Sequence, residues 1–566
     1  MRRLPGILSL ALVSVIMAVG CADEAVDVDD EWGMDGPVEP VPPPGKEDAQ
    51  NRRGLLVATN TSRTQVWTAR NAWEDRTSAA ARAPGLAWTA DSGLSWDEKL
   101  SRWVESLAWI PSVDGYSMTV ELTTPWGKTL PSPYLECAEM AMFLRITFAA
   151  WYELPLQLEA VSNGQRVYFG HYGVRTAAGR FAQSPEFAIV YRDHGASNWR
   201  AQWPRDATLR TRKLHGGIDE QPELGANQVF GAYVDELHVN KRAAYFTVLT
   251  LNYLSSANLA DTANTYNLVP DAIRAGDVLI ERWQRTGIGH TLVVHDVREF
   301  GEGNLDVTML SGSMPRRQGV REAGQASKGY FTSEYAGGPG TAPSGEPYAK
   351  LGGGLKRWRV TKNVGGYWTN TWMSGDEAHW INSTDYPRIA ARTSRFAALL
   401  GQVSPQQQRA ELLSVIADAR HHLGQYPASC AARERREHAF RELYDLGERE
   451  IGMTRAQIDS EHRELEDYVL GELDYTTSKT CCWNSSTSAM FEIVLAKARA
   501  EQASGTCVPP TVFRARPDGY RTWSDFAQSL GRSSDWRAWS EDEACAQRNV
   551  AEDTVLPLAA TPYCEL

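Results

Sequence analysis

The spacing of apolar residues divides the chain, after its first 53 residues, into two regions. Between residues 54 and 365, amphipathic helical spacings alternate with short β-branched and apolar runs, a mixture typical of an α+β fold. From about Ser404 onward, most segments have helical spacing with opposite charges four residues apart. We therefore expect one domain over 54–365, a connector over 366–403 and a helical domain over 404–566.

The individual elements of the first region follow from the same patterns. Residues 93–110 have the spacing of an amphipathic helix, and a second, more buried helix follows Cys137. The strands that we predict are 277–283, 290–297, 305–315 and 352–360, with strand or mixed structure at 167–174 and 244–255. A hairpin turn at 298–304 would fold 305–315 back onto 290–297.

The N-terminus has the pattern of a targeting segment. Basic residues at 2–3 precede an apolar stretch over 4–20, and acidic residues follow, so residues 1–20 predict a secretory signal peptide. Its end, "MAVGC", resembles the lipobox of bacterial lipoproteins, which implies that Cys21 is lipidated and becomes the mature N-terminus. Ala18 departs from the usual Leu, so ordinary cleavage after Gly20 stays open. Ala22 after the cysteine implies the outer membrane.

Composition and charge narrow the class of protein. Residues 21–53 are acidic and Pro-rich, which predicts a solvated linker behind the lipid. Apolar residues make up 42% of the 566 residues and charged residues 23%, as in a globular protein of two or three domains. The net charge of -12 argues against nucleic acid as a partner, because phosphate binding needs a basic surface. The only membrane contact that we expect is the N-terminal lipid, and the sequence does not indicate an oligomeric state.

The eight cysteines fall into three groups. Cys21 belongs to the N-terminal motif. Six are candidates for three disulfides in the C-terminal domain, namely Cys430, Cys481, Cys482, Cys507, Cys545 and Cys564. Metal binding is the alternative for these six, but no ligand spacing supports it, and we expect neither a metal nor a cofactor.

Cys137 is then alone in a cysteine-free stretch from residue 22 to residue 429. An unpaired cysteine in an exported protein is a candidate reactive thiol, although a small buried core residue is the alternative. Pro131 and Pro133 exclude a helix before it, which places the sulfur in the first turn of the predicted helix. The N–H groups of a helix start stabilise both a thiolate and an oxyanion.

A thiol nucleophile needs a histidine as base, and His290 is the best placed of the 11 histidines. It begins the predicted strand 290–297, directly after a Gly-containing turn. A strand end can hold an imidazole rigidly towards a helix start. The alternative is a sheet histidine bonded only to backbone.

The motifs "ECAEMAMFLR" at Cys137, Gly276-Asp277 before a strand, and Gly289-His290 before a second strand resemble the NlpC-type papain-like cysteine peptidases and amidases. The similarity runs from about Trp96 to Val360. It implies a papain-like α+β domain with the cysteine at a helix N-terminus packed on an antiparallel sheet. It also implies a cell-envelope enzyme that cleaves amide bonds in the stem peptides of peptidoglycan.

In this family the third catalytic residue lies on the strand after the histidine and is often His, Asn or Gln. This chain departs from that pattern. Asp296 is too far along the strand, because six residues span roughly 20 Å. The hairpin instead brings Ser311 and Ser313 opposite His290. We expect Cys137, His290 and Ser311 to be catalytic, with Glu136, Tyr134 and Ser313 as supporting residues.

Three functions are consistent with these residues. The first is an exported, lipid-anchored thiol hydrolase with a cell-wall peptide or another amide as substrate. The second is an acyl or transglutaminase-like transferase that uses the same pair. The third is an inactive envelope scaffold of the same fold, in which the hydroxyl of Ser311 is too weak an orienting group. In each case we expect the C-terminal helices to be a binding or packing accessory.

Overall fold

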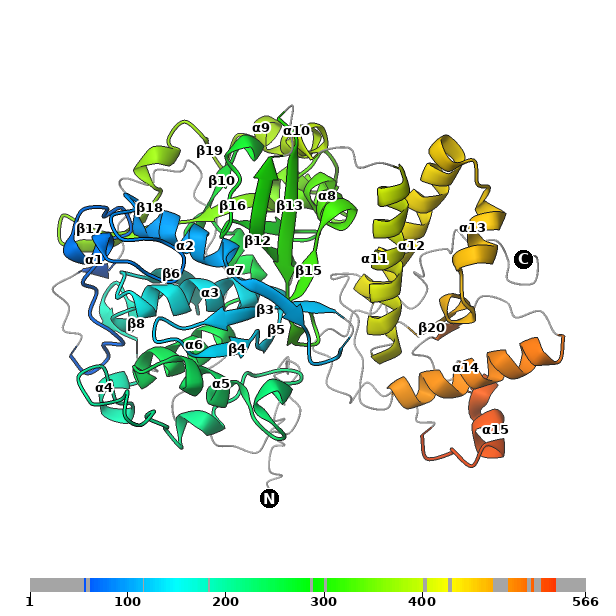
Figure 1. The fold of residues 1–566 in the computed structure, drawn as a ribbon, viewed down its shortest axis with the longest axis horizontal. Helices are drawn as coiled ribbons and strands as arrows, with labels where there is room; N and C mark the ends of the chain where they lie inside the picture. Colours follow the sequence, from blue (N-terminus) through cyan, green and yellow to red (C-terminus); the bar gives the residue numbers. More distant parts are fainter. Residues whose placement is uncertain are drawn as a thin grey trace, which may run out of the picture.

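The computed structural model describes residues 55–56, 62–115, 117–181, 184–285, 289–299, 303–400, 405–425, 430–471, 487–505, 511–513 and 521–535. Helices and mostly antiparallel sheets share the chain up to residue 400, and helices dominate after residue 405, as Figure 1 shows. The predicted α+β class is therefore confirmed. The predicted signal peptide, the predicted linker and Cys21 lie outside the described residues.

A seven-stranded sheet lies at the centre of the first region, and all of its described strand pairs are antiparallel. In order across the sheet, its strands are β15 (Val320–Glu322), β13 (Leu305–Ser311), β12 (His290–Glu299), β11 (Val278–Glu281), β16 (Gly354–Trp358), β10 (Thr265–Leu268) and β19 (Trp380–Ile381). The predicted hairpin is confirmed, because β12 pairs with β13.

Smaller sheets surround this one. They are β2 (Ala108–Pro111) with β3 (Met118–Thr123) and β4 (Thr129–Pro131); β6 (Gln157–Ser162) with β7 (Gln165–Gly170), β8 (Gly173–Thr176) and β9 (Gly179–Arg180); β1 (Leu55–Leu56) with β18 (Tyr367–Thr371) and β17 (Val360–Val364); and β14 (Arg317–Gln318) with β5 (Tyr134–Leu135). The last pair matters for function, since β5 ends two residues before Cys137.

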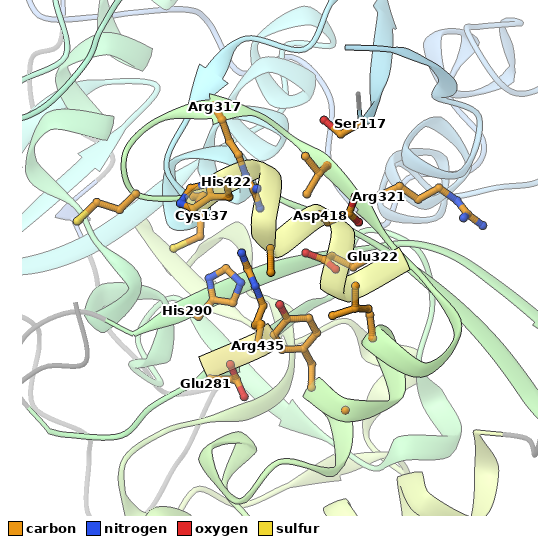
Figure 2. Close-up of a pocket in the computed structure, with 18 of the residues that line it drawn as sticks. Ser117, Cys137, Glu281, His290, Arg317, Arg321, Glu322, Asp418, His422 and Arg435 are labelled. Atoms are coloured by element: carbon orange, nitrogen blue, oxygen red, sulfur yellow. The ribbon is translucent and has the colours of Figure 1, made fainter. Parts of the chain in front are cut away.

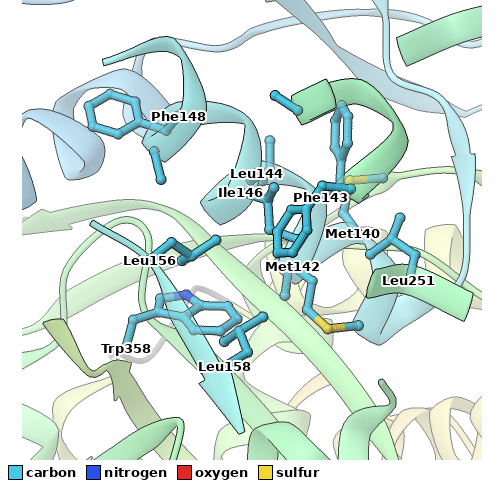
Figure 3. Close-up of a cluster of buried hydrophobic side chains, with 14 of the residues drawn as sticks. Met140, Met142, Phe143, Leu144, Ile146, Phe148, Leu156, Leu158, Leu251 and Trp358 are labelled. Atoms are coloured by element: carbon cyan, nitrogen blue, oxygen red, sulfur yellow. The ribbon is translucent and has the colours of Figure 1, made fainter. Parts of the chain in front are cut away.

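Helix α3 (Cys137–Trp151) lies against the central sheet and is buried almost all round. Twelve of its 15 residues are buried. Met142, Ile146 and Phe148 have no exposed surface, and Figure 3 shows this helix among its apolar neighbours. Burying a large apolar side chain contributes about 1.5–3 kcal/mol. The residue that begins this helix is therefore held on a rigid support.

Helix α2 (Trp96–Glu105) confirms the helix predicted within 93–110, and the chain then continues as β2. Ser95 starts the helix, because its hydroxyl accepts from the Glu98 N–H and the Glu98 carboxylate accepts from the Ser95 N–H at 2.7 Å.

Two expectations for the first region are wrong. Residues 244–255, expected as strand or mixed structure, lie mostly in helix α6 (Lys241–Tyr253), which Asn240 caps. Aromatic and β-branched residues favour strands on average, but a helix buried on most sides needs the same residues. Residues 366–403 are not a connector. They supply β18, β19, α9 (Tyr386–Ala390) and α10 (Arg392–Leu399), and both strands pair with strands of the preceding domain.

Helices form most of the described residues after 404, as predicted. The exceptions include residues 469–471, expected in a helix, which form β20 (Val469–Gly471) and pair in parallel with β21 (Thr511–Phe513). The α-helices of this region are α11 (Pro405–Gln425), α12 (Cys430–Leu446), α13 (Arg455–His462), α14 (Thr487–Ala503) and α15 (Arg521–Ser529). Helices α11 and α12 pack side by side, and α11 also contacts α8 (Gly324–Thr332) beside the central sheet, as Figure 1 shows. We call α11 and α12 the helical hairpin.

Of the six disulfide candidates, only Cys430 lies in a described element, at the start of α12, and its side chain is outside the described part. Cys481, Cys482, Cys507, Cys545 and Cys564 lie outside the described residues. The disulfide prediction therefore stays a prediction. Among the described helices, none is long and apolar enough to cross a membrane.

Candidate active site

Cys137 is the first residue of α3, as predicted, and its thiol is unpaired and half-buried. The preceding residue, Glu136, has the extended backbone of a helix cap, and its N–H donates to the Glu139 carboxylate at 2.7 Å. The sequence before the cysteine thus ends one strand, β5, and starts one helix within three residues. This sharp change of direction brings the sulfur to the surface of a cavity.

His290 is the first residue of β12 and lies opposite Glu281 of β11. Gly289 allows the strand to begin there. A Cβ at residue 289 would lie 2.3 Å from the carbonyl oxygen of Glu281, so a larger residue would push the strand away. The Gly289 N–H donates to the hydroxyl of Ser256 at 2.7 Å. The close approach of two backbones therefore explains the glycine of the "GH" motif.

Ser311 ends β13, and its Oγ lies 3.2 Å from Nε2 of His290. The same hydroxyl donates to the carbonyl of Gly312 at 3.0 Å. A serine hydroxyl has one proton, so at His290 it accepts, and Nε2 carries the imidazole hydrogen. Nδ1 is then the unprotonated nitrogen of the neutral ring, which is the form that a general base needs.

Gly312 joins this histidine pair to the cysteine segment. A Cβ at residue 312 would lie 2.6 Å from the Glu136 carbonyl oxygen, so the chain just after β13 packs directly on the residue before Cys137. The neighbouring Ser313 donates its N–H to the carbonyl of Leu135 at 3.3 Å. The end of β13, with Ser311, and the start of α3 are therefore held together by backbone contacts.

The thiol and the imidazole line the same cavity, whose volume is about 1060 Å³. Figure 2 shows the sulfur of Cys137 on the side of the cavity where the His290 ring lies. The thiol donates to the carbonyl of Gly289, the residue before His290, with 3.7 Å between Sγ and the oxygen. The structure thus brings together the three residues expected to be catalytic.

The three residues expected to support catalysis, Tyr134, Glu136 and Ser313, all line this cavity. The N–H of Tyr134 donates to the side chain of Gln221 at 2.9 Å. Asp296 was set aside in the sequence analysis because it lies too far along the strand from His290. In the structure it follows a bulge in β12, and its Oδ2 lies 2.5 Å from Nε of Arg298.

Burial favours the neutral form of both the Cys137 thiol and the His290 imidazole. It raises the pKa of Cys137 to about 12, with a further rise from the charges of Glu136 and Glu139, although the N–H groups of Thr291 and Ala138 act in the other direction. Burial also lowers the pKa of His290 to about 3, helped by the charges of Arg435 and Arg317. At neutral pH the resting pair is a thiol and a neutral imidazole rather than a thiolate and an imidazolium.

Glu136 is the carboxyl group nearest to Cys137 in sequence, and its pKa is raised to about 8 by burial and by Glu139, against the pull of Arg316. Above that pH its negative charge opposes ionisation of the thiol. Glu136→Gln should therefore speed the alkylation of Cys137 by iodoacetamide several-fold at pH 9, and less at pH 6. Peptide mass spectrometry over a pH series measures these rates.

The matched control for this change is Glu153→Gln. Glu153 lies just beyond the far end of α3 and pairs with Arg70 at 2.7 Å. It should leave the alkylation rate unchanged. Equal rates in wild type and Glu136→Gln at pH 9 would mean that the carboxylate has no influence on the thiol.

Ser311→Ala removes the group that holds the imidazole in its reactive tautomer. We expect kcat for hydrolysis to fall about tenfold or more while KM stays within twofold, since the change affects proton transfer and not substrate contacts. Thr308→Ala is the control, because Thr308 is buried on the same strand and does not line the cavity. Steady-state kinetics on one amide substrate compares the two, and a similar loss in both variants would assign the effect to packing.

The cavity also contains residues that the sequence did not indicate. The helical hairpin supplies Asp418, His422 and Arg435, and the first region supplies Arg317 and Tyr330. A charge-rich helix predicts a solvated face, so no local pattern marked Asp418 or Arg435. Among the described residues, no group of three or more His, Cys, Asp or Glu side chains could hold a metal ion.

Comparisons with family models, with curated proteins and with solved structures find no match to the chain.

Proposed function

We propose that this chain is an exported, lipid-anchored thiol hydrolase that cleaves amide bonds, with Cys137 as nucleophile and His290 as base. The observation that supports it best is the single cavity that holds the thiol at a helix start, the imidazole at a strand start and the Ser311 hydroxyl on Nε2. A merely structural cysteine requires none of these neighbours.

The first half of the reaction makes an acyl-enzyme. As Sγ attacks the amide carbonyl carbon, its proton passes to Nδ1 of His290, and the carbonyl oxygen becomes an oxyanion. The Cys137 N–H, unpaired within the helix because it stands at the helix start, can donate to that oxyanion. His290 then gives the proton to the leaving nitrogen, the C–N bond breaks, and an amine departs from the thioester.

The second half restores the enzyme. A water molecule gives a proton to His290 and attacks the thioester carbonyl, and the sulfur leaves with that proton returned to it. Because the resting pair is neutral, proton transfer accompanies attack in both halves. Ser311 keeps the proton on Nε2 and so keeps Nδ1 available each time.

The proposed substrate is an amide in peptidoglycan stem peptides, and the proposed location is the outer membrane of a bacterial envelope. Both rest on the resemblance of the two motifs to NlpC-type enzymes and on the lipobox-like end of the signal peptide. A lipid on Cys21 and the linker over 21–53 would place the cavity near the cell wall.

A digest of purified peptidoglycan tests this proposal. Wild type should release peptides with a new amine and a new carboxylate, as measured by mass spectrometry, and Cys137→Ala should release none. If the enzyme is a transferase, added ethanolamine should take the acyl group instead of water, so the new carboxyl end of the peptide should carry an ethanolamine amide. If neither product forms and Cys137 also resists alkylation, the chain is a scaffold and the hydrolase proposal is wrong.

A further inference from the structure

Two arginines from distant parts of the chain meet beside the catalytic pair. Arg317 lies on β14, directly opposite Leu135 of β5, and Arg435 lies on α12 of the helical hairpin. Both line the cavity, and their charges act on His290. Figure 2 shows the two side chains reaching into the space around Cys137 and His290. Both guanidinium groups therefore share one cavity with the thiol and the imidazole.

One donor of these two arginines is unsatisfied. Nε of Arg317 is buried and has no hydrogen-bond partner within the part of the chain that the structure describes. Arg435 interacts with the hydroxyl of Tyr330, whose ring lies 5.6 Å from the His290 ring, centroid to centroid. Buried donors are normally paired, and an unpaired one costs about 1–3 kcal/mol. A bound acceptor would satisfy the Arg317 group.

Two carboxyl groups, Glu322 and Asp418, face the same arginines. Burial raises the pKa of both, against the opposing effect of the arginines, so both hold a proton to higher pH than a free side chain. A guanidinium remains charged at neutral pH even here, where burial lowers the pKa of Arg317 to about 10. The two guanidinium groups are therefore the charged donors that this part of the cavity offers to an anionic ligand.

We infer that Arg317 and Arg435 bind a carboxylate of the substrate next to the amide that Cys137 attacks, so that the helical hairpin completes the active site. The substrate class is then an acyl amide with a free carboxylate close to the bond that breaks. Guanidinium groups suit this ligand, since their planar N–H groups match the geometry of a carboxylate. As a statement about catalysis the inference rests on the proposed function, but the anion site can be tested without it.

Two alkylating reagents of nearly equal size test the site on the full-length protein. Iodoacetate carries a carboxylate and iodoacetamide a neutral amide. Each forms a bond between Sγ and its CH₂ carbon, releases iodide, and leaves the thiol proton with His290 or solvent. Peptide mass spectrometry measures both rates at Cys137. We expect the ratio of the iodoacetate rate to the iodoacetamide rate to be about tenfold or more above that of Cys137 in urea-unfolded protein.

Variants of the two arginines test whether these side chains cause the raised ratio of alkylation rates. Arg435→Gln and Arg317→Gln should each reduce the ratio towards that of the unfolded protein, and Arg435→Lys should keep most of it because the charge remains. Arg449→Gln is the control, since Arg449 is exposed on the turn after α12 and outside the cavity. A folded-state ratio equal to the unfolded one, or a ratio that neither glutamine variant changes, overturns the inference.

Thermal unfolding provides a measurement that does not need a reactive thiol. A ligand that binds only the folded state raises the melting temperature. We compare the dianion glutarate with the neutral glutaramide at equal ionic strength. In wild type the melting temperature should be higher with glutarate than with glutaramide, and in Arg435→Gln the two temperatures should be equal. If Cys137 resists both reagents, the hydrolase proposal fails while this comparison still decides the anion site. No difference between the two additives would then overturn the inference.

Discussion

Replacing His290 with alanine should slow both amide hydrolysis and the alkylation of Cys137 by between about 100-fold and 10,000-fold. The reason is the raised pKa of Cys137, about 12, which leaves very little thiolate at pH 7. Without a base, only that thiolate reacts. Burial lowers the pKa of His290 to about 3, which keeps its ring unprotonated through the ordinary pH range but also makes it a weaker base, so the thiol proton must pass to it during attack and not before.

The pH dependence distinguishes this mechanism from one with a preformed ion pair. In His290→Ala the alkylation rate should rise about tenfold per pH unit between pH 6 and 9, because it follows the thiolate. In wild type the alkylation rate should be the sum of two contributions. One follows the thiolate in the same way, and the other, in which neutral His290 takes the proton, does not change between pH 6 and 9. His379→Ala is the control, since His379 is exposed and does not line the cavity. If His290→Ala kept the wild-type rate, another group would have to be the base.

Replacing Arg316 with methionine should lower the free energy of unfolding of the first region by about 3–5 kcal/mol. Arg316 is 3% exposed and binds both carboxylate oxygens of Glu139, at 2.9 and 2.7 Å. It also donates to the carbonyls of His215 and Gly216. Methionine fills the space but leaves a buried carboxylate and two carbonyl groups without their partner.

Denaturant unfolding followed by tryptophan fluorescence measures this change. Fifteen of the 20 tryptophans lie between residues 62 and 400, so the signal reports mainly the first region. Arg63→Met is the matched control. Its partner is Glu186, Arg63 is 66% exposed, and the loss of such a surface pair should cost less than about 1 kcal/mol. Similar losses in the two variants would show that the Arg316 network does not stabilise the helix start.

The two elements that carry the proposed catalytic pair could be predicted because their signals are local. Pro131 and Pro133 before Cys137 exclude an earlier helix start, and the length and helix-forming composition of the apolar run after it indicate a buried helix. The hairpin of β12 and β13 follows from two strand patterns and a short turn, and its register brings Ser311 to His290. Each of these inferences depends on residues within about 25 positions of one another.

Elements that depend on distant partners were not predictable in this way. Helix α6 has the composition of a strand, and its environment of α3 and α5 (Phe230–Leu237) makes it a buried helix. Strand β19 is only two residues long, and it pairs with β10, which lies more than 100 positions earlier in the chain, so no local pattern marks it. Strand β18 is different, because it pairs with the preceding β17 across Gly365 and Gly366, a local hairpin signal that our sequence prediction overlooked.

The sequence alone was enough to single out Cys137 as a candidate nucleophile, to choose His290 among the histidines and to place Ser311 across the hairpin. The folded chain was needed to show that Arg317 and Arg435, 118 positions apart, reach the same cavity. It was also needed to show that burial keeps the thiol and the imidazole neutral. The physical reason is that helix and hairpin patterns are properties of neighbouring residues, whereas desolvation and the charge around a site depend on every segment that packs against it.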